Sequence, residues 1–170
     1  EFSQALCVND LDRDGIMDCW ETQGWGIDIN SDNVIDLDLY ALGARPDHKD
    51  LFVEVDAMEL LEPRPQALQK VKNAFAAVPN RYVDNPDGAP GINLHIQRDD
   101  TTLRFSEWTT GWWTSFYNLK EENFGTLAER SHPDSVYILG AKRLVFRYCI
   151  FAHSYDTTGS SEVAEGLYSN

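Results

Sequence analysis

The chain has 170 residues, 42% of them hydrophobic and 25% charged, which suits one folded domain and argues against disorder or a coiled coil. Lys and Arg number 14 and Asp and Glu number 28, so the net charge is −14. A surface this acidic repels phosphate backbones and anionic lipids, so we expect neither nucleic acid nor a membrane as a partner. It favours cations, and Ca²⁺ is the cation that suits dense carboxylates.

Composition divides the chain near residue 50. Residues 1–50 are rich in Asp, Gly and Asn and contain no long apolar run, so we predict a calcium-loop segment there. Residues 51–170 alternate strand and helix patterns, and we predict a strand–helix–strand–helix–strand domain over that range. The sequence has neither a run of about 18 apolar residues nor a signal peptide at its start. We therefore expect a mature or processed form.

The elements predicted after residue 50 follow from composition and from turn signals. In chain order they are a strand at Leu51–Met58, a helix between Pro65 and Pro79, a strand at Ile92–Ile96, an aromatic-rich helix within Phe105–Asn118 with a continuation over Glu121–Arg130, and a strand at Leu144–Ala152. Residues 156–170 are predicted to be loop with an edge strand. This order predicts an α/β or α+β fold, with a mixed or parallel sheet covered by helices.

The strongest local motif is the twelve-residue stretch Asp10–Glu21, which fits the EF-hand calcium loop position by position. Gly15 occupies the sharp turn, and Glu21 can bind a cation with both carboxylate oxygens. Too few residues precede Asp10 for an incoming helix, so we predict an EF-like loop rather than a complete hand. The alternative is a solvated acidic turn. The predicted ligands are Asp10, Asp12, Asp14, the carbonyl group of Ile16, Asp18 and Glu21.

A second loop, Asp28–Leu39, follows the same spacing. Asn33 replaces the glycine, since asparagine tolerates the left-handed conformation, and Leu39 replaces the final glutamate, for which Asp38 could substitute. The loops form a short internal repeat, and two calcium ions are expected in an N-terminal clasp that folds when calcium binds. The predicted ligands of the second loop are Asp28, Asn30, Asp32, the carbonyl group of Val34, and Asp36.

The chain contains three cysteines. Cys7 and Cys19 flank the first loop, and we predict a disulfide between them that staples it. Cys149 lies in an apolar run. It is either a small buried hydrophobic residue or the partner of a cysteine beyond residue 170.

No complete catalytic constellation is present. The sequence has no HExxH, Cys-x-x-Cys, Gly-x-Ser-x-Gly or phosphate-binding loop. Glu54 and Asp56 share one strand face, which we interpret as a solvated face or a calcium contact rather than an acid pair. Hydrogen-bonded structural roles are predicted for the histidines, which are His48, His95, His132 and His153.

Residues 14–21, 36–44 and 48–56 resemble the start of a group of secreted zincin-like zinc metallopeptidases, and residues 141–153 and 158–161 resemble the same group. The resemblance covers most of the chain. It implies that a zinc helix with HExxH follows this point of the chain, in which two histidines bind zinc and the glutamate acts as general base. No catalytic or zinc-binding residue can be carried over, because the matching positions are absent.

The resemblance therefore implies that this chain is the upper, N-terminal half of a zincin-like catalytic domain, with residues 154–170 running toward the edge strand that borders a peptide cleft. Zinc, a peptide or protein substrate and activity would then depend on a companion C-terminal remainder of the same protein. Secretion is expected.

Two other functions remain open from sequence. One is a non-enzymatic, calcium-dependent extracellular binding module of lectin or adhesion type, for which the Trp112–Trp113 region is the argument. Core packing is the simpler interpretation of those tryptophans. The other is a metal enzyme in which folding brings His95 and His153 together.

Overall fold

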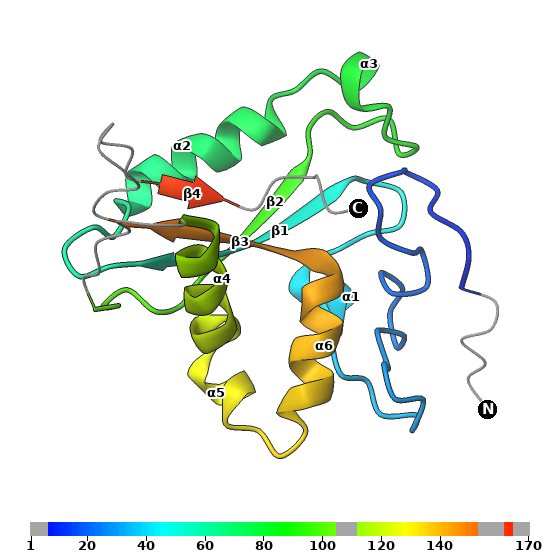
Figure 1. Ribbon diagram of the computed structural model, residues 1–170. Coiled ribbons are helices and arrows are strands. Elements are labelled where there is room, and N and C mark those ends of the chain that lie inside the picture. Colours follow the sequence, from blue (N-terminus) through cyan, green and yellow to red (C-terminus); the bar gives the residue numbers. More distant parts are fainter. Residues whose placement is uncertain (1–6, 105–111, 153–161, 165–170) are drawn as a thin grey trace.

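Four strands form one mixed sheet in the computed structural model, which describes residues 7–104, 112–152 and 162–164. The strand order is β2-β1-β3-β4 (Figure 1). The central strand β1 runs parallel to both β2 and β3, and β4 pairs antiparallel with β3. The bounds are Asp50–Ala57 for β1, Asn93–Arg98 for β2, Phe146–Phe151 for β3 and Glu162–Ala164 for β4. The predicted mixed sheet is confirmed.

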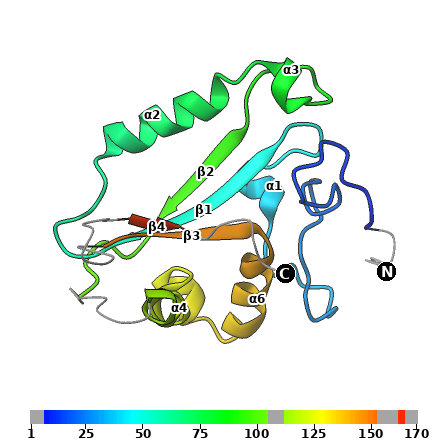
Figure 2. The ribbon, with the colours of Figure 1, turned by 45° about the horizontal axis from the view of Figure 1, so that its top comes forward.

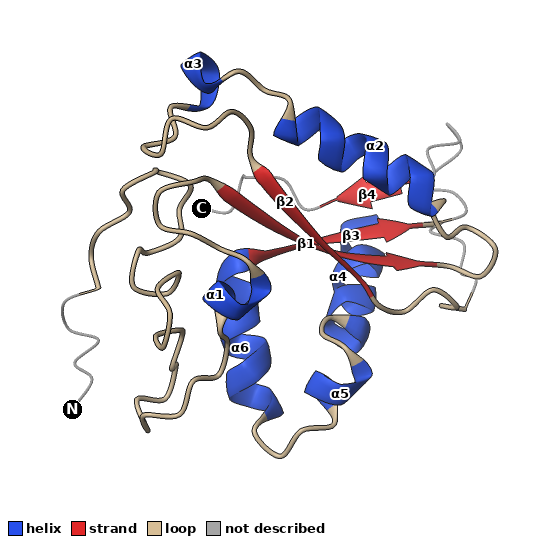
Figure 3. Cartoon of the chain, turned by 180° about the vertical axis from the view of Figure 1, so that it is seen from behind, coloured by secondary structure: helices blue, strands red, loops and turns tan. Residues whose placement is uncertain are grey.

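Helices cover both faces of the sheet. The helix α2 (Pro65–Ala76) connects β1 to β2 and lies on one face, while α4 (Trp112–Asn123) and α6 (Ser135–Val145) lie on the other (Figure 2). The short α5 (Leu127–Arg130) joins α4 to α6, and single-turn helices form at α1 (Leu39–Leu42) and α3 (Asn80–Val83). Between residue 7 and α1 the chain is loop without helix or strand (Figure 3).

The hydrophobic core lies on the face of the sheet that carries α4 and α6. Burial alternates along β3, and the ring of Tyr148 packs 5.7 Å from that of Phe116 of α4. Phe52 of β1 packs 5.1 Å from Phe146. The loop segment before β1 packs onto the same core through Ile16, Ile27, Leu37 and Leu39. These buried side chains thus belong to the same core cluster as those of the sheet and its helices.

Most predicted elements are confirmed, but α6 and the single-turn helices α1 and α3 were missed. The strands at residues 51–58 and 92–96, the helix that starts at Pro65, and an edge strand after residue 156 are all present. The strand predicted at Leu144–Ala152 starts too early. Residues 144 and 145 end α6, and the strand begins at Phe146. The apolar residues 136–139 are consecutive and do not follow a helical period, which concealed this helix.

Parts of the aromatic region lie outside the described residues. The predicted helix there is present from Trp112 onward as α4, and its Phe116 is fully buried in the core. Trp108 lies outside the described part, and so do the side chains of Trp112 and Trp113. The suggestion of a tryptophan-rich binding surface therefore stays a prediction.

Glu54 and Asp56 are fully buried, so the prediction of a solvated face is wrong. Glu54 accepts a hydrogen bond from the backbone N–H of Gly125 at 2.8 Å and pairs with Lys142 of α6 at 2.6 Å. Asp56 accepts hydrogen bonds from the Tyr148 hydroxyl at 2.7 Å and from the N–H of Asp100 at 3.1 Å. The acids face the helices because the burial pattern of β1 places their side of the strand toward the core.

The pair between Glu54 and Lys142 provides a stability test. Lys142 is 0% exposed and also contacts Glu129 at 2.8 Å. Lys142→Ala leaves two carboxylates without their cation, and we expect a loss of about 3–5 kcal/mol in the free energy of unfolding. The neighbouring Arg143 pairs with Glu121 at the surface, so Arg143→Ala should cost less than about 1 kcal/mol. Urea unfolding measures both, and equal losses would contradict the buried role.

Candidate metal centre

The first acidic loop is held in shape by hydrogen bonds from its own backbone. Asp10 accepts from the N–H groups of Asp14 and Gly15, at 3.2 and 3.1 Å. Asp12 accepts from the N–H of Asp14 at 3.1 Å, and Asp14 from that of Ile16 at 2.7 Å. One carboxylate oxygen from each of the three aspartates lies within 4.8 Å of the others. The loop therefore gathers three of the predicted ligands at one point.

The second loop repeats this bonding pattern. Asp28 accepts from the N–H groups of Asp32 and Asn33, at 3.2 and 2.9 Å, and Asp32 accepts from Val34 at 2.7 Å. The residues with left-handed backbone conformation also occupy equivalent positions in the two loops. Ser31 (φ 62°) corresponds to Arg13 (φ 64°), and Asn33 (φ 70°) corresponds to Gly15 (φ 94°). The two loops thus share one local fold, as their spacing indicated.

The loops differ at their last position. In the first loop, Glu21 is 0% exposed, and neither of its carboxylate oxygens has a hydrogen-bond partner among the described residues. The same holds for one oxygen of Asp12, which is 2% exposed. In the second loop the corresponding residue is Leu39, a fully buried core residue. Only the first loop therefore presents buried acceptor atoms that need a partner.

Burial changes the protonation of the first loop. The pKa of Glu21 rises to about 10, mainly through burial and then through the nearby charges of Asp14 and Asp12. The pKa of Asp12 rises to about 7, again through burial and then through Asp14. Burial also raises the pKa of Asp14, although N–H groups of Asp50 and Ile16 oppose the shift. Such carboxyl groups ionise readily only beside a cation.

A residue that sequence reasoning missed lies beside this loop. The sequence placed Asp50 at the end of the loop segment, but it is the first residue of β1 and is 4% exposed. Its N–H donates to Asp14 at 2.7 Å. One carboxylate oxygen each from Asp14, Glu21 and Asp50 lies within 4.8 Å of the others. No spacing rule could indicate this, because Asp14 and Asp50 are 36 positions apart.

The second loop closes on itself at the surface. The side-chain amide of Asn30 donates to Asp32 at 2.9 Å, and Asp36 accepts from the N–H of Ile29 at 2.8 Å. Asp38 caps α1 by accepting from the N–H of Ala41 at 2.9 Å, and its substitution for the missing glutamate stays a prediction. Val34 is exposed. Among the described residues, the aspartates of this loop form no group of three within 4.8 Å.

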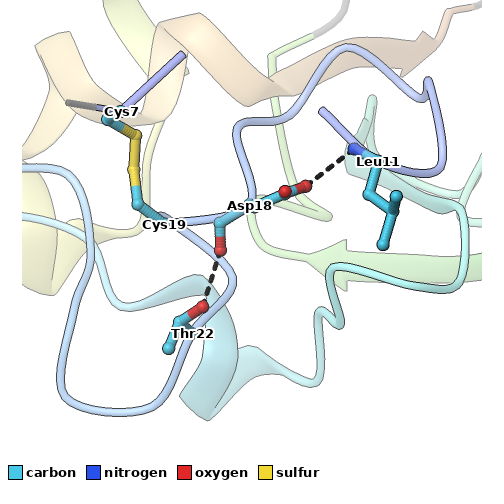
Figure 4. The surroundings of a disulfide bond; sticks show 5 residues. All are labelled: Cys7, Leu11, Asp18, Cys19 and Thr22. Atoms are coloured by element: carbon cyan, nitrogen blue, oxygen red, sulfur yellow. Dashed lines mark hydrogen bonds between the residues drawn. A yellow bond between two sulfur atoms is a disulfide. The ribbon is translucent and has the colours of Figure 1, made fainter. Parts of the chain in front are cut away.

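The predicted disulfide between Cys7 and Cys19 is confirmed (Figure 4). The cysteines are 12 positions apart, and their ring encloses the first loop from residue 10 to residue 18. Asp18 lies beside this bond; its carboxylate accepts from the N–H of Leu11 and its carbonyl from the hydroxyl of Thr22, both at 2.8 Å (Figure 4). A ring of this size stabilises by roughly 3 kcal/mol, which favours the ordered loop.

Three histidines have the hydrogen-bonded roles predicted for them. His95 pairs with Asp50, and its ring stacks on Phe52 with centroids 4.2 Å apart. His48 bonds Asp87 at 2.9 Å, and His132 accepts from the N–H of Asp134 at 3.1 Å. His153 lies outside the described residues. A metal site that pairs it with His95 therefore stays a prediction.

Comparisons with protein-family models, curated proteins and solved structures return no match for this chain. In the described part of the chain, no helix has the length and apolar character needed to cross a membrane. The protein is therefore a mixed α/β domain, and its N-terminal loop carries buried acidic groups that could hold a metal ion.

Glu21 gives a pH test in the presence of a chelator. Its raised pKa means that the folded protein keeps a proton that the unfolded chain releases near pH 4.5, so stability falls as pH rises from about 5 to about 10. One proton changes the free energy of unfolding by at most about 1.4 kcal/mol per pH unit. Glu21→Gln should flatten this decline in urea titrations with EDTA. Glu59→Gln, at an exposed position, should follow the parent, and parallel curves for all three proteins would contradict the assignment.

Proposed function

We propose that this chain is the calcium-stabilised N-terminal portion of a secreted zinc metalloendopeptidase, whose zinc-binding motif is not in this chain. One observation carries the calcium part: Glu21 is fully buried with both carboxylate oxygens unpartnered among the described residues. An unpaired carboxylate costs several kcal/mol in such a place. A dication bound by both oxygens removes that cost.

The chemistry of the donor set favours calcium over other metals. All predicted ligands of the first loop are oxygen atoms, from Asp10, Asp12, Asp14, Asp18, Glu21 and the carbonyl group of Ile16. Zinc prefers nitrogen and sulfur in structural sites, and magnesium demands an octahedron and keeps several waters. Calcium accepts six to eight oxygens in irregular geometry, including a bidentate glutamate. The first loop is the stronger site, and binding by the second is weak because Leu39 supplies no ligand.

Calcium would order the segment before β1. That segment has no helix or strand before α1 in the described residues, yet it sends Ile16, Ile27 and Leu37 into the shared core. A ligand that binds only the folded state stabilises that state by RT ln(1 + [L]/Kd). This is about 2.7 kcal/mol when the free calcium concentration is a hundred times Kd. Millimolar extracellular calcium suffices for a site of moderate affinity.

The peptidase part of the proposal rests on the sequence resemblance. The stretches that carry it include β1 with the turn before it, and the end of α6 with β3. The antiparallel β4 beside β3 is compatible with the edge strand that borders the peptide cleft in the resembled group. The disulfide is typical of oxidising compartments and supports secretion. In this proposal the chain supplies scaffold, and a C-terminal remainder supplies zinc and the general base.

Calcium removal tests the stabilising role. We expect EGTA to increase amide hydrogen exchange in residues 7–49 far more than in β1 and β3, because that segment depends on the cation and the sheet on its core. In saturating calcium, Glu21→Gln should show the exchange pattern of the EGTA-treated parent, whereas Glu59→Gln should not. Unchanged protection of residues 7–49 in EGTA would contradict the proposal.

The peptidase part is tested on the protein from its native source. Mass spectrometry with peptide sequencing should find a segment that carries HExxH, either continuous with this chain or bound to it, together with one zinc ion per protein. A native protein with neither HExxH nor zinc would overturn this part. Stoichiometric zinc and peptidase activity in the 170-residue chain alone would overturn the scaffold role.

A further inference from the structure

We infer that the cation of the first loop takes a ligand from outside the loop, the carboxylate of Asp50, and so clamps the N-terminal segment to the central strand of the sheet. This inference rests on the proposed calcium site and names a ligand that the loop motif does not contain. The site would then depend on two parts of the chain that are brought together only by folding.

The first argument is distance. One oxygen each from Asp14, Glu21 and Asp50 lies within 4.8 Å of the others. Calcium binds oxygen at about 2.3–2.6 Å, so two oxygens on one ion are separated by at most about 5 Å. All three carboxylates can therefore contact the same ion without rearrangement of the backbone. Asp14 also belongs to the group with Asp10 and Asp12, which joins the strand residue to the loop.

The second argument is that the buried carboxylate oxygens beside Asp50 need a positively charged partner. Both oxygens of Glu21 are buried and unpartnered among the described residues, and one of them lies within 4.8 Å of an oxygen of Asp14 and an oxygen of Asp50. Asp50 is itself buried, and its carboxylate bonds only His95 and the backbone N–H of Arg45 among the described residues. Three carboxylates so close repel one another in a buried place unless a cation lies between them.

The third argument is that Asp50 is held ready for this role. Its N–H donates to Asp14 at 2.7 Å, which fixes the start of β1 against the loop. Its carboxylate accepts from the N–H of Arg45 at 2.9 Å and bonds His95 of β2. Each carboxylate oxygen has two lone pairs, so both bonds leave capacity for a metal. Such outer bonds orient a ligand and are typical of metal sites.

The consequence is mechanical coupling between the loop and the sheet. A cation bound by Asp14, Glu21 and Asp50 ties the loop to the first residue of β1, and the bond from Asp50 to His95 extends the connection to β2. The second loop has no counterpart, since its last position is a core leucine. Occupancy of the first loop therefore stabilises the sheet edge as well as the loop.

Terbium(III), which replaces calcium and reports its bound water through its luminescence lifetime, tests the inference. Asp50→Ala should add about one water to the bound ion, as lifetimes in H₂O and D₂O show, and should weaken terbium binding by roughly tenfold or more. Asp47→Ala, three residues away at an exposed position, should change neither quantity. An unchanged water count in Asp50→Ala would reduce Asp50 to a positioning role and overturn the inference.

A second measurement does not depend on the folding of a variant. A crystal structure of the terbium-loaded parent chain should place an Asp50 oxygen within about 2.6 Å of the ion. An ion bound to the loop but beyond about 3.5 Å from Asp50 would overturn the inference while leaving the proposed function intact. If the parent chain binds neither terbium nor calcium, the proposed function itself fails.

Discussion

Buried negative charge at the junction of loop and sheet is the constraint on which the rest of this structure depends. Glu21 and Asp12 of the first loop and Asp50 at the start of β1 are almost fully removed from solvent. Burial raises the pKa values of Glu21 and Asp12, because desolvation opposes charge. The position of the loop against the core therefore depends on how those two carboxylates are neutralised, by protons or by a cation.

The domain contains a second acidic group, Glu54, Asp56 and Asp99, whose oxygens also lie within 4.8 Å of one another, and it differs from the first loop in the partners that the chain supplies. Glu54 and Asp56 are as buried as Glu21, but Lys142, Tyr148 and backbone N–H groups provide their partners. The ion pair between Glu54 and Lys142 connects β1 with α6. The charge of Lys49 acts on Asp12 of the first loop, but none of the loop's acids forms an ion pair with a lysine among the described residues.

The two acidic loops have the same local fold but different roles. Their hydrogen bonds and left-handed residues correspond closely. The last position then separates them: Glu21 extends the first loop toward Asp50, whereas Leu39 extends the second into the hydrophobic core. In the proposed function the first loop binds the ion that stabilises the domain, and the second acts mainly as a connection that positions α1. A scaffold of this kind suits the N-terminal part of a larger extracellular enzyme.

The sequence by itself determined the features that short-range geometry controls. The loop at Asp10–Glu21 depends on bonds between residues at most a few positions apart, the disulfide spans 12 positions, and the strands β1 and β2 carry clear composition signals. Tertiary structure alone decided what depends on long-range register. The parallel pairing of β1 with β3 turns Glu54 toward Lys142, and the start of β1 carries Asp50 to the first loop. Residues so far apart in sequence become neighbours only through strand order and packing, which no local pattern encodes.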